Sequence, residues 1–294
     1  MPTTRTHHGI IVGVDGSAPS KVAVDWAARE ASMRGVPLTV VHVIPPLLDW
    51  MSEVQIPDEL EDLRQRDGQQ ILSAARQTAE AATKSKSIEI HEELSSSNVL
   101  STLIDFSKSS ELVVVGCRGL GAIGRRLLGS VSSGLVHHAH CPVAVIHDED
   151  PLMPHPSEAP VVVGIDGSPA SESATAIAFD EASRRGVQLI AVHAWSDFSA
   201  YELPGLQRAE LEEQANETLA GRLAGWQERY PDVDVRRVVV CDRAAHQLLE
   251  QSESAQLTVV GSHGRGGFAG MMLGSVSSAV AESARMPVIV ARRS

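Results

Sequence analysis

The heptapeptide Ile11–Ser17 reads IVGVDGS, and Val162–Ser168, 151 residues further along the chain, reads VVGIDGS. The pair Val41-His42 recurs at the same spacing as Val192-His193. Self-similarity over such a distance marks tandem copies of one structural unit, because each copy must fold around its own core. The sequence therefore predicts two domains with the same fold.

A second repeated stretch shows where the copies differ in length. The hexapeptide LGSVSS occurs at 128–133 and again at 273–278, which are 145 residues apart. The second copy is therefore six residues shorter, somewhere between His193 and Gly261. Between the copies, residues 147–160 read HDEDPLMPHPSEAP, whose acidic residues and prolines are typical of an extended linker. We predict domain 1 at 1–147, a linker at 148–159 and domain 2 at 160–294.

Composition sets limits on the class of protein. The chain has 294 residues, and 43% of them are hydrophobic, which is enough for two cores. No apolar run is long enough to span a bilayer, and no basic-then-apolar leader is present, so we expect a cytoplasmic protein. The formal net charge of −12 disfavours binding to nucleic acid or to an anionic membrane. The three cysteines lack the spacing of a disulfide framework or a zinc ribbon, so reduced thiols are expected.

The order of strand and helix signals predicts the fold class. In the first copy, short runs rich in Val, Ile and Leu predict strands at 9–15, 37–43, 87–94, 112–117 and 143–146. Apolar runs without strict alternation suit parallel strands buried on both faces, and the Ala-rich stretches between them suit crossover helices. Gly35 and Gly186 are placed to end the first helix of each copy. Each copy is therefore predicted to be a doubly wound α/β domain, which binds ligands beyond the carboxyl ends of its strands.

A glycine-rich loop after the fourth strand is the main functional signal. Gly116 and Gly119 are followed after nine residues by Gly129-Ser130, and Gly261 and Gly264 are followed after nine residues by Gly274-Ser275. Glycines let backbone N–H groups approach an anion, and a helix N-terminus favours negative charge. The spacing predicts a phosphate-binding loop in each copy. The alternative is that the glycines only form a tight turn and that the two serines are ordinary helix caps.

Basic side chains in these loops are expected to neutralise phosphate in an otherwise acidic protein. They are Arg118, Arg125 and Arg126 in the first copy and His263 and Arg265 in the second. Two better-known nucleotide motifs do not explain the loops. The G-x-G-x-x-G match at 119–124 follows the fourth strand, whereas a dinucleotide fingerprint follows the first, and the chain has no G-x-x-x-x-G-K-[ST] match.

The spacing G-x-x-G, nine residues, G-[ST], together with an Asp that ends the first strand, resembles the ATP-binding signature of the universal stress protein family. The resemblance covers both copies. It implies a five-stranded parallel sheet of order 3-2-1-4-5 with helices on both faces, and dimerisation through the last strand, which a tandem chain can satisfy internally as a pseudo-dimer. It also implies ATP as the ligand, with Mg²⁺, and possible homodimers.

The resemblance assigns ligand contacts residue by residue. Those in the first copy are Gly13, Val14, Asp15, Val43, Val115, Gly116, Gly119, Gly129, Ser130, Val131 and Ser132. Those in the second copy are Gly164, Ile165, Asp166, Ala194, Val260, Gly261, Gly264, Gly274, Ser275, Val276 and Ser277. The basic loop residues Arg118 and Arg265 are added to these contacts because of their charge and not because of the resemblance. Asp15 and Asp166 are expected near ribose and adenine, although Asp-Gly-Ser is also turn chemistry.

No catalytic constellation is recognisable, and no catalytic residue is assigned. The leading hypothesis is a cytoplasmic, ATP-binding stress-response regulator in which occupancy of two sites sets conformation, assembly or the binding of a regulatory protein partner. The alternatives are a slow ATPase or a phosphoryl or nucleotidyl transferase, and a structural partner-binding protein that ATP stabilises.

The remaining candidates have less support. His137, His140 and Cys141 fall at helical spacing and offer a metal site or a solvent-facing surface. Cys117 lies beside Arg118, which favours a thiolate and a redox role. His42 and His193 are expected to pack at the ends of strands. Trp50 and Trp195 are placed in the loops after the second strands, where they cover the pockets or pack on the surface.

Overall fold

The computed structural model describes residues 8–46, 58–84, 86–119, 128–147, 156–195, 208–264 and 273–292, and the side chains of residues 208–211 are excepted. The chain separates into two compact units, Met1–Asp148 (domain 1) and Glu149–Ser294 (domain 2). This boundary falls at the start of the predicted linker. Within the described part of that linker, Pro156–Glu158 form one 3₁₀ turn.

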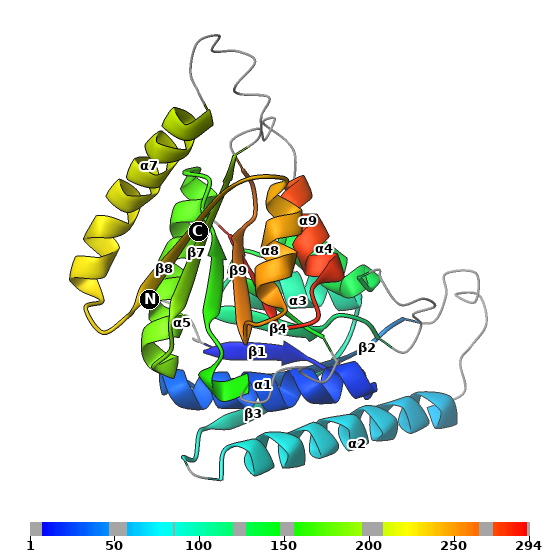
Figure 1. The fold of residues 1–294 in the computed structure, drawn as a ribbon. Helices are drawn as coiled ribbons and strands as arrows, with labels where there is room; N and C mark the ends of the chain where they lie inside the picture. The colour runs from blue at the N-terminus through cyan, green and yellow to red at the C-terminus, as the bar shows by residue number, and fades with distance from the viewer. Residues whose placement is uncertain are drawn as a thin grey trace, which may run out of the picture. The chain divides into compact units, whose positions relative to one another are not determined.

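Domain 1 is a parallel sheet with helices on both faces (Figure 1). Its strands lie in the order β3-β2-β1-β4-β5, as the family resemblance implies. The elements are β1 (Ile10–Gly13), α1 (Ala18–Arg34), β2 (Leu38–Ile44), α2 (Asp58–Ala82), β3 (Ile90–Ser96), α3 (Val99–Ser107), β4 (Leu112–Gly116), α4 (Ser130–His138) and β5 (Val143–Ile146).

Domain 2 repeats this arrangement with strand order β8-β7-β6-β9-β10. Its elements are β6 (Val161–Gly164), α5 (Pro169–Arg185), β7 (Leu189–Trp195), α7 (Arg208–Arg229), β8 (Val235–Cys241), α8 (Ala244–Ser252), β9 (Leu257–Gly261), α9 (Ser275–Ser283) and β10 (Val288–Ala291). Trp195 is thus the last residue of β7, not a loop residue as predicted.

The predicted strands of domain 1 are confirmed, with shifts at their ends. The fifth strand matches at both ends, whereas β3 begins and ends later than the predicted 87–94. The difference arises because β3 pairs along its whole length with β2, and Ser95 and Ser96 align with Val43 and Ile44. Backbone pairing on an edge strand does not require apolar side chains, so the polar end of β3 gave no strand signal.

The first crossover helix of each domain is fixed at both ends by the expected residues. The Ser17 side chain accepts a hydrogen bond from the backbone N–H of Ser20 at the start of α1, and Ser168 does the same for α5. Gly35 and Gly186 end the two helices with φ of 70° and 64°. Because only glycine adopts this left-handed conformation cheaply, the predicted C-caps are confirmed.

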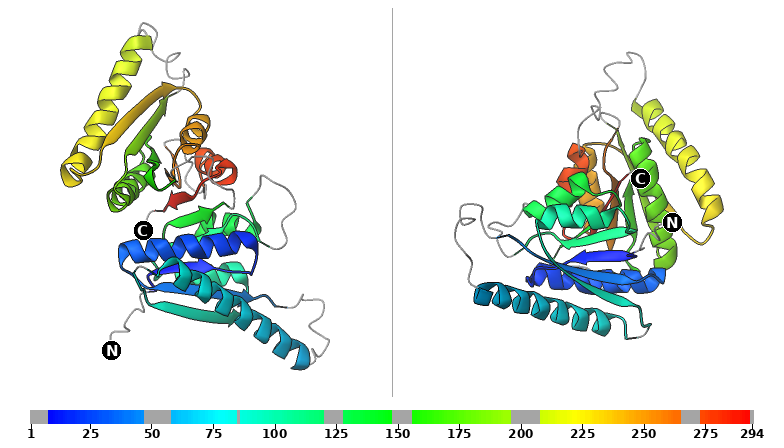
Figure 2. Two further views of the ribbon diagram at one scale, coloured as in Figure 1. Left: turned by 60° about the horizontal axis from the view of Figure 1, so that its bottom comes forward. Right: turned by 180° about the vertical axis from the view of Figure 1, so that it is seen from behind.

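The helices cover the two faces of each sheet in pairs. In domain 1, α1 packs mainly on β4 and β1 and α2 on β2 and β3, while α3 packs with α4 on the other face (Figures 1 and 2). In domain 2, α5 packs on β6 and β9, α7 on β7 and β8, and α8 packs with α9. The carboxyl ends of the central strands are left free between these layers.

The first two helices of each domain differ in the size of the side chains at three equivalent positions. Ala28 of α1 and Ala75 and Ala79 of α2 are buried in domain 1. The residues 151 positions later are Phe179, Trp226 and Tyr230, whose rings lie 5.7–6.4 Å apart in domain 2. The offset of 151 therefore persists through the second helix. The six missing residues fall between its end and β8.

Within the described ranges, no helix has the length and apolar character needed to cross a bilayer.

Candidate functional site

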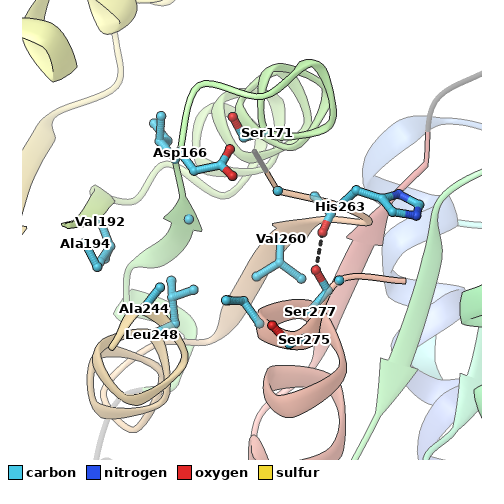
Figure 3. Close-up of a pocket in the computed structure, with 16 residues that line it drawn as sticks. Asp166, Ser171, Val192, Ala194, Ala244, Leu248, Val260, His263, Ser275 and Ser277 are labelled. Atoms are coloured by element: carbon cyan, nitrogen blue, oxygen red, sulfur yellow. Dashed lines mark hydrogen bonds between the residues drawn. The ribbon is translucent and has the colours of Figure 1, made fainter. Parts of the chain in front are cut away.

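Each domain has a cavity at the carboxyl ends of its central strands. The cavity has a volume of about 710 Å³ in domain 1 and about 420 Å³ in domain 2. Both volumes fall within the range typical of small-molecule sites. Figure 3 shows the domain 2 cavity, with Asp166 and Ser171 on one side and Val260, Ser275 and Ser277 on the other.

Every predicted contact residue that the structure describes lines one of these cavities. The structure thus brings the Asp-Gly-Ser turn, the end of the second strand and the glycine loop to one place in each domain. Arg265, and the two further loop arginines Arg125 and Arg126, lie outside the described residues. His263 also lines the domain 2 cavity, but Figure 3 shows its imidazole directed away from Asp166 and Ser171.

The helix after the glycine loop begins at Ser130 and Ser275, as predicted. Its N-cap residue is Gly129 in α4 and Gly274 in α9, and no side chain among the described residues caps either helix. The interpretation of Ser130 and Ser275 as ordinary helix caps is therefore wrong. The first N–H groups of a helix have no partner within the helix, and at these two ends no described side chain takes one of them. The uncapped ends line the cavities and suit an anion.

Hydrogen bonds hold the uncapped helix against the end of the fourth strand. The Ser132 hydroxyl donates to the carbonyl of Gly116 at 2.7 Å, and Ser277 bonds Gly261 in the same way. The backbone N–H of Gly129 donates to Cys117 O at 2.8 Å, and that of Gly274 donates to Ser262 O at 2.7 Å. These bonds close both ends of the loop, so the helix N-terminus is fixed before a ligand arrives.

Gly116 and Gly261 have a packing role that the sequence did not reveal. A Cβ at Gly116 would lie 2.9 Å from the carbonyl carbon of Pro19, and one at Gly261 would lie 2.7 Å from that of Ala170. Real Cβ atoms do not approach backbone so closely. These two glycines are therefore required where the fourth strand passes under the first helix.

The aspartate of the Asp-Gly-Ser turn is oriented by the turn itself. In domain 1, Asp15 Oδ1 accepts hydrogen bonds from the Ser17 backbone N–H at 3.0 Å and from its hydroxyl at 2.6 Å. In domain 2, Asp166 accepts from the Ser168 N–H at 2.9 Å. The turn role and the cavity-lining position are thus combined in one residue rather than being alternatives.

His42 and His193 each hydrogen-bond to the backbone just before this turn. Nδ1 of His42 lies 2.7 Å from the carbonyl oxygen of Val14, and Nδ1 of His193 lies 2.6 Å from that of Ile165. Because a carbonyl only accepts, each Nδ1 carries the proton. Each ring therefore positions the residue that precedes the aspartate.

Several lining residues were missed from sequence. Val99 and Leu103 of α3, and Ala244 and Leu248 of α8, form an apolar wall in the two cavities. Ala244 follows Val99 by 145 residues, and Leu248 follows Leu103 by the same number. This repeat offset was the signal available in the sequence. Ser20 and Ser171, from the first turns of α1 and α5, were also missed.

Two other candidates lose support. Across the described residues, no group of three or more His, Cys, Asp or Glu side chains converges on a metal site, so the proposed set of His137, His140 and Cys141 is not one. The Cys117 thiol is 2% exposed, which leaves it shielded from solvent oxidants in this conformation. Trp50 lies outside the described residues.

One carboxylate near the domain 2 cavity has a strongly shifted pKa. Hydrogen bonds from the Gln247 side chain, the Arg243 backbone N–H and the His246 ring lower the pKa of Asp242 to about 2. Each of these bonds favours the charged form of the carboxyl group. Asp242 thereby fixes the start of α8, which supplies Ala244 and Leu248 to the cavity.

Comparison with known families identifies the family of both domains. Residues 7–147 and 159–292 each match the universal stress protein family. The chain belongs to this family, as two tandem domains, and the family assigns it to the response to stress.

Individual relatives extend over the whole chain. It is 55% identical to universal stress protein Rv2005c of Mycobacterium tuberculosis over 295 residues, which cover 100% of both chains. It is 54% identical to universal stress protein Rv2623 of the same species, over 100% of this chain and 99% of the relative. The crystal structure of a universal stress protein from Archaeoglobus fulgidus has the same fold, with a TM-score of 0.72 at 22% identity over 98% of this chain and 100% of that one.

Proposed function

We propose that the chain is a stress-response regulator that binds ATP at two sites, one in each domain, and that occupancy of these sites sets its conformation, its assembly or its binding to a protein partner. The observation that carries this proposal is the uncapped N-terminus of α4 and of α9 at the wall of a cavity. The first turns of α1 and α5 also line the cavities, through Ser20 and Ser171, but these two helices are capped by their own serines, so α4 and α9 offer an anion more donors than α1 and α5 do.

The residues suit the parts of the nucleotide differently. The backbone N–H groups at Ser130–Ser132 and Ser275–Ser277 would hold the phosphates, which need donors and positive potential. The apolar wall of Leu103 or Leu248 and the end of the second strand would contact the adenine. Asp15 and Asp166 would accept hydrogen bonds from the ribose hydroxyls. Mg²⁺ would enter with the triphosphate, whose oxygens are its usual ligands.

Regulation by occupancy is favoured over turnover because the best-placed carboxylates already have partners. Oδ1 of Asp15 accepts two bonds from Ser17, and Asp166 accepts one from Ser168. A carboxylate held in this way positions a ligand well but is a weak general base. A slow ATPase or a phosphoryl or nucleotidyl transferase is the alternative.

The test measures both the effect of ATP on conformation and the rate of ATP hydrolysis in one preparation of the protein. We expect ATP with Mg²⁺ to slow limited proteolysis of the purified chain and ADP to form far more slowly than 1 s⁻¹, the lower end of typical enzyme turnover. Turnover near or above that rate would favour the enzyme. Cleavage that is unchanged by saturating ATP would contradict regulation through conformation.

A further inference from the structure

The two nucleotide sites differ in what lies beside the Asp-Gly-Ser turn. In domain 1, a second cavity of about 390 Å³ lies between α1 and α2 and shares Val14, Ser20 and Ile71 with the main cavity. The two cavities are therefore neighbours, with the side chain of Ile71 at their border.

In domain 2 an arginine stands where Ile71 borders the two cavities of domain 1. Arg222 stands 151 residues after Ile71, at the same position of the second helix. Ile71 lies over Gly16, with its Cγ1 3.3 Å from where a Cβ of Gly16 would be, whereas the guanidinium of Arg222 lies directly against Gly167. The two side chains thus cover equivalent glycines, and the longer one extends over the turn.

A charged partner holds Arg222 in place. Its Nη1 lies 3.2 Å from the Oε1 of Glu172 and 3.4 Å from the carbonyl oxygen of Gly167. Glu172 occupies the position of Lys21 in domain 1, which lines the second cavity there. The pair Lys21 and Ile71 has therefore been replaced by Glu172 and Arg222, which bond to each other.

A second position on the same helix also carries a larger side chain in domain 2 than in domain 1. A Cβ at Gly68 of α2 would lie 3.1 Å from Cδ2 of His42, and His42 lines the domain 1 cavity. The position 151 residues later holds Leu219, which is 1% exposed. His193 is 8% exposed and is not among the described residues that line the domain 2 cavity. Larger side chains on α7 thus accompany the smaller volume of that cavity.

We propose that the domain 1 site accepts adenine nucleotides that carry a second group on the ribose, and that domain 2 excludes them because Arg222 fills the adjoining space. This inference rests on the proposed ATP sites, in which Asp15 contacts the ribose. The second cavity is lined at that same turn by Val14 and Gly16, so a group attached to a ribose hydroxyl would enter it.

The lining of the second cavity indicates the class of the added group. Val24, Ile71, Ala74 and Ala75 give it an apolar floor, and Lys21, Asp67 and Gln70 give it polar side chains. A ring with hydrogen-bonding substituents fits this combination, because its faces pack on the floor and its edge meets the polar side chains. An acyl or heterocyclic ribose substituent is therefore the expected ligand class.

The test uses ATP that carries an N-methylanthraniloyl group on its ribose as the probe, with unmodified ATP as the reference. We expect the wild-type chain to bind two equivalents of ATP but one equivalent of the probe. Hydrogen exchange should show protection by the probe in α1 and none in α5. The substitution Arg222→Ile should raise the probe to two equivalents, a gain that misfolding cannot produce. Arg229→Ile, on the same helix but stacked on Trp226, is the matched control and should leave one equivalent.

A substitution that fills the second cavity of domain 1 provides the complementary test. Ala74 is exposed and lines the second cavity but not the main one, so Ala74→Trp should weaken probe binding at least tenfold and leave ATP at two equivalents. If the wild-type chain binds two equivalents of ATP but either two or no equivalents of the probe, this inference alone is overturned. The same holds if the Arg222→Ile chain still binds only one equivalent of the probe. Failure to bind ATP at all would overturn the proposed function and this inference with it.

Discussion

The carboxylate of Asp15 lies directly against the α-carbon of Gly119, so that a Cβ at Gly119 would overlap Asp15 Oδ2. Domain 2 repeats the relationship, since a Cβ at Gly264 would lie 2.7 Å from Asp166 Oδ2. A side chain at the second glycine of each G-x-x-G would therefore displace the carboxylate of a distant turn, in addition to affecting any contact with a ligand.

This relationship predicts the effect of a single methyl group. Gly119→Ala should displace the Asp15 carboxylate and weaken ATP binding in domain 1 at least tenfold, a loss of about 1.4 kcal/mol or more. Gly264→Ala should do the same in domain 2. Isothermal titration would detect each as the loss of one tight site. Gly225→Ala is the control because nothing lies within 4 Å of the position that its Cβ would take. If the Gly119→Ala chain keeps two tight ATP sites with unchanged affinity, the prediction is wrong.

The glycine at the end of the fourth strand should act through stability. A Cβ at Gly116 would press on the Pro19 backbone, so Gly116→Ala should destabilise domain 1 by about 1–3 kcal/mol, as overpacking does. Urea unfolding of the nucleotide-free protein measures this directly. Gly221→Ala, in an open helical position, should instead stabilise by up to about 1 kcal/mol. A Gly116→Ala chain as stable as the wild type would show that the strand and helix separate freely.

A buried hydroxyl in β9 offers a stabilising substitution. Thr258 is 0% exposed, and its Oγ1 has no hydrogen-bond partner among the described residues. Domain 1 has Val113 at this position. Because an unpaired buried hydroxyl is costly, Thr258→Val should stabilise domain 2 by about 1 kcal/mol, and the reverse change Val113→Thr should destabilise domain 1 by a similar amount. Denaturant midpoints test both, and a less stable Thr258→Val chain would contradict the assignment.

The shifted carboxylate predicts a pH dependence. The pKa of Asp242 is about 2 in the folded chain, below the ordinary aspartate value near 3.9. A depressed folded pKa contributes stability above the unfolded pKa and loses it as the pH falls through the folded one. Asp242→Asn should therefore reduce the acid sensitivity of domain 2 between about pH 4 and pH 2. Carboxyl carbon NMR should give a midpoint near 2 in the wild type, and a midpoint at or above 3.9 would disprove the shift.

Much of the architecture could be predicted from sequence because it rests on local signals. The start of α4 and α9 at Ser130 and Ser275 was predicted from the Gly-Ser pair that precedes a helical pattern, and the C-caps Gly35 and Gly186 were predicted from helix-ending glycines. The strand order was implied by the family resemblance and is the order of each sheet. The late end of β3 was missed because Ser95 and Ser96 pair through their backbone alone.

What the sequence did not reveal depends on contacts between distant elements. The need for glycine at Gly116 comes from Pro19 in another helix, and the difference between the sites comes from Arg222 reaching Gly167. Neither contact leaves a pattern in the residues near it. The loop arginines were predicted from their positions in the glycine loops. Of these arginines, Arg118 is among the described residues, and it lines the domain 1 cavity.

Each domain is proposed to bind one ATP. Native mass spectrometry of the purified chain with ATP and Mg²⁺ counts the bound nucleotides directly. The same measurement with 3′,5′-cyclic AMP is the comparison, because this nucleotide has no triphosphate to bind at the uncapped helix N-terminus. We expect two ATP per chain and weaker binding of the cyclic nucleotide. A chain that remains free of nucleotide at saturating ATP would contradict this proposal.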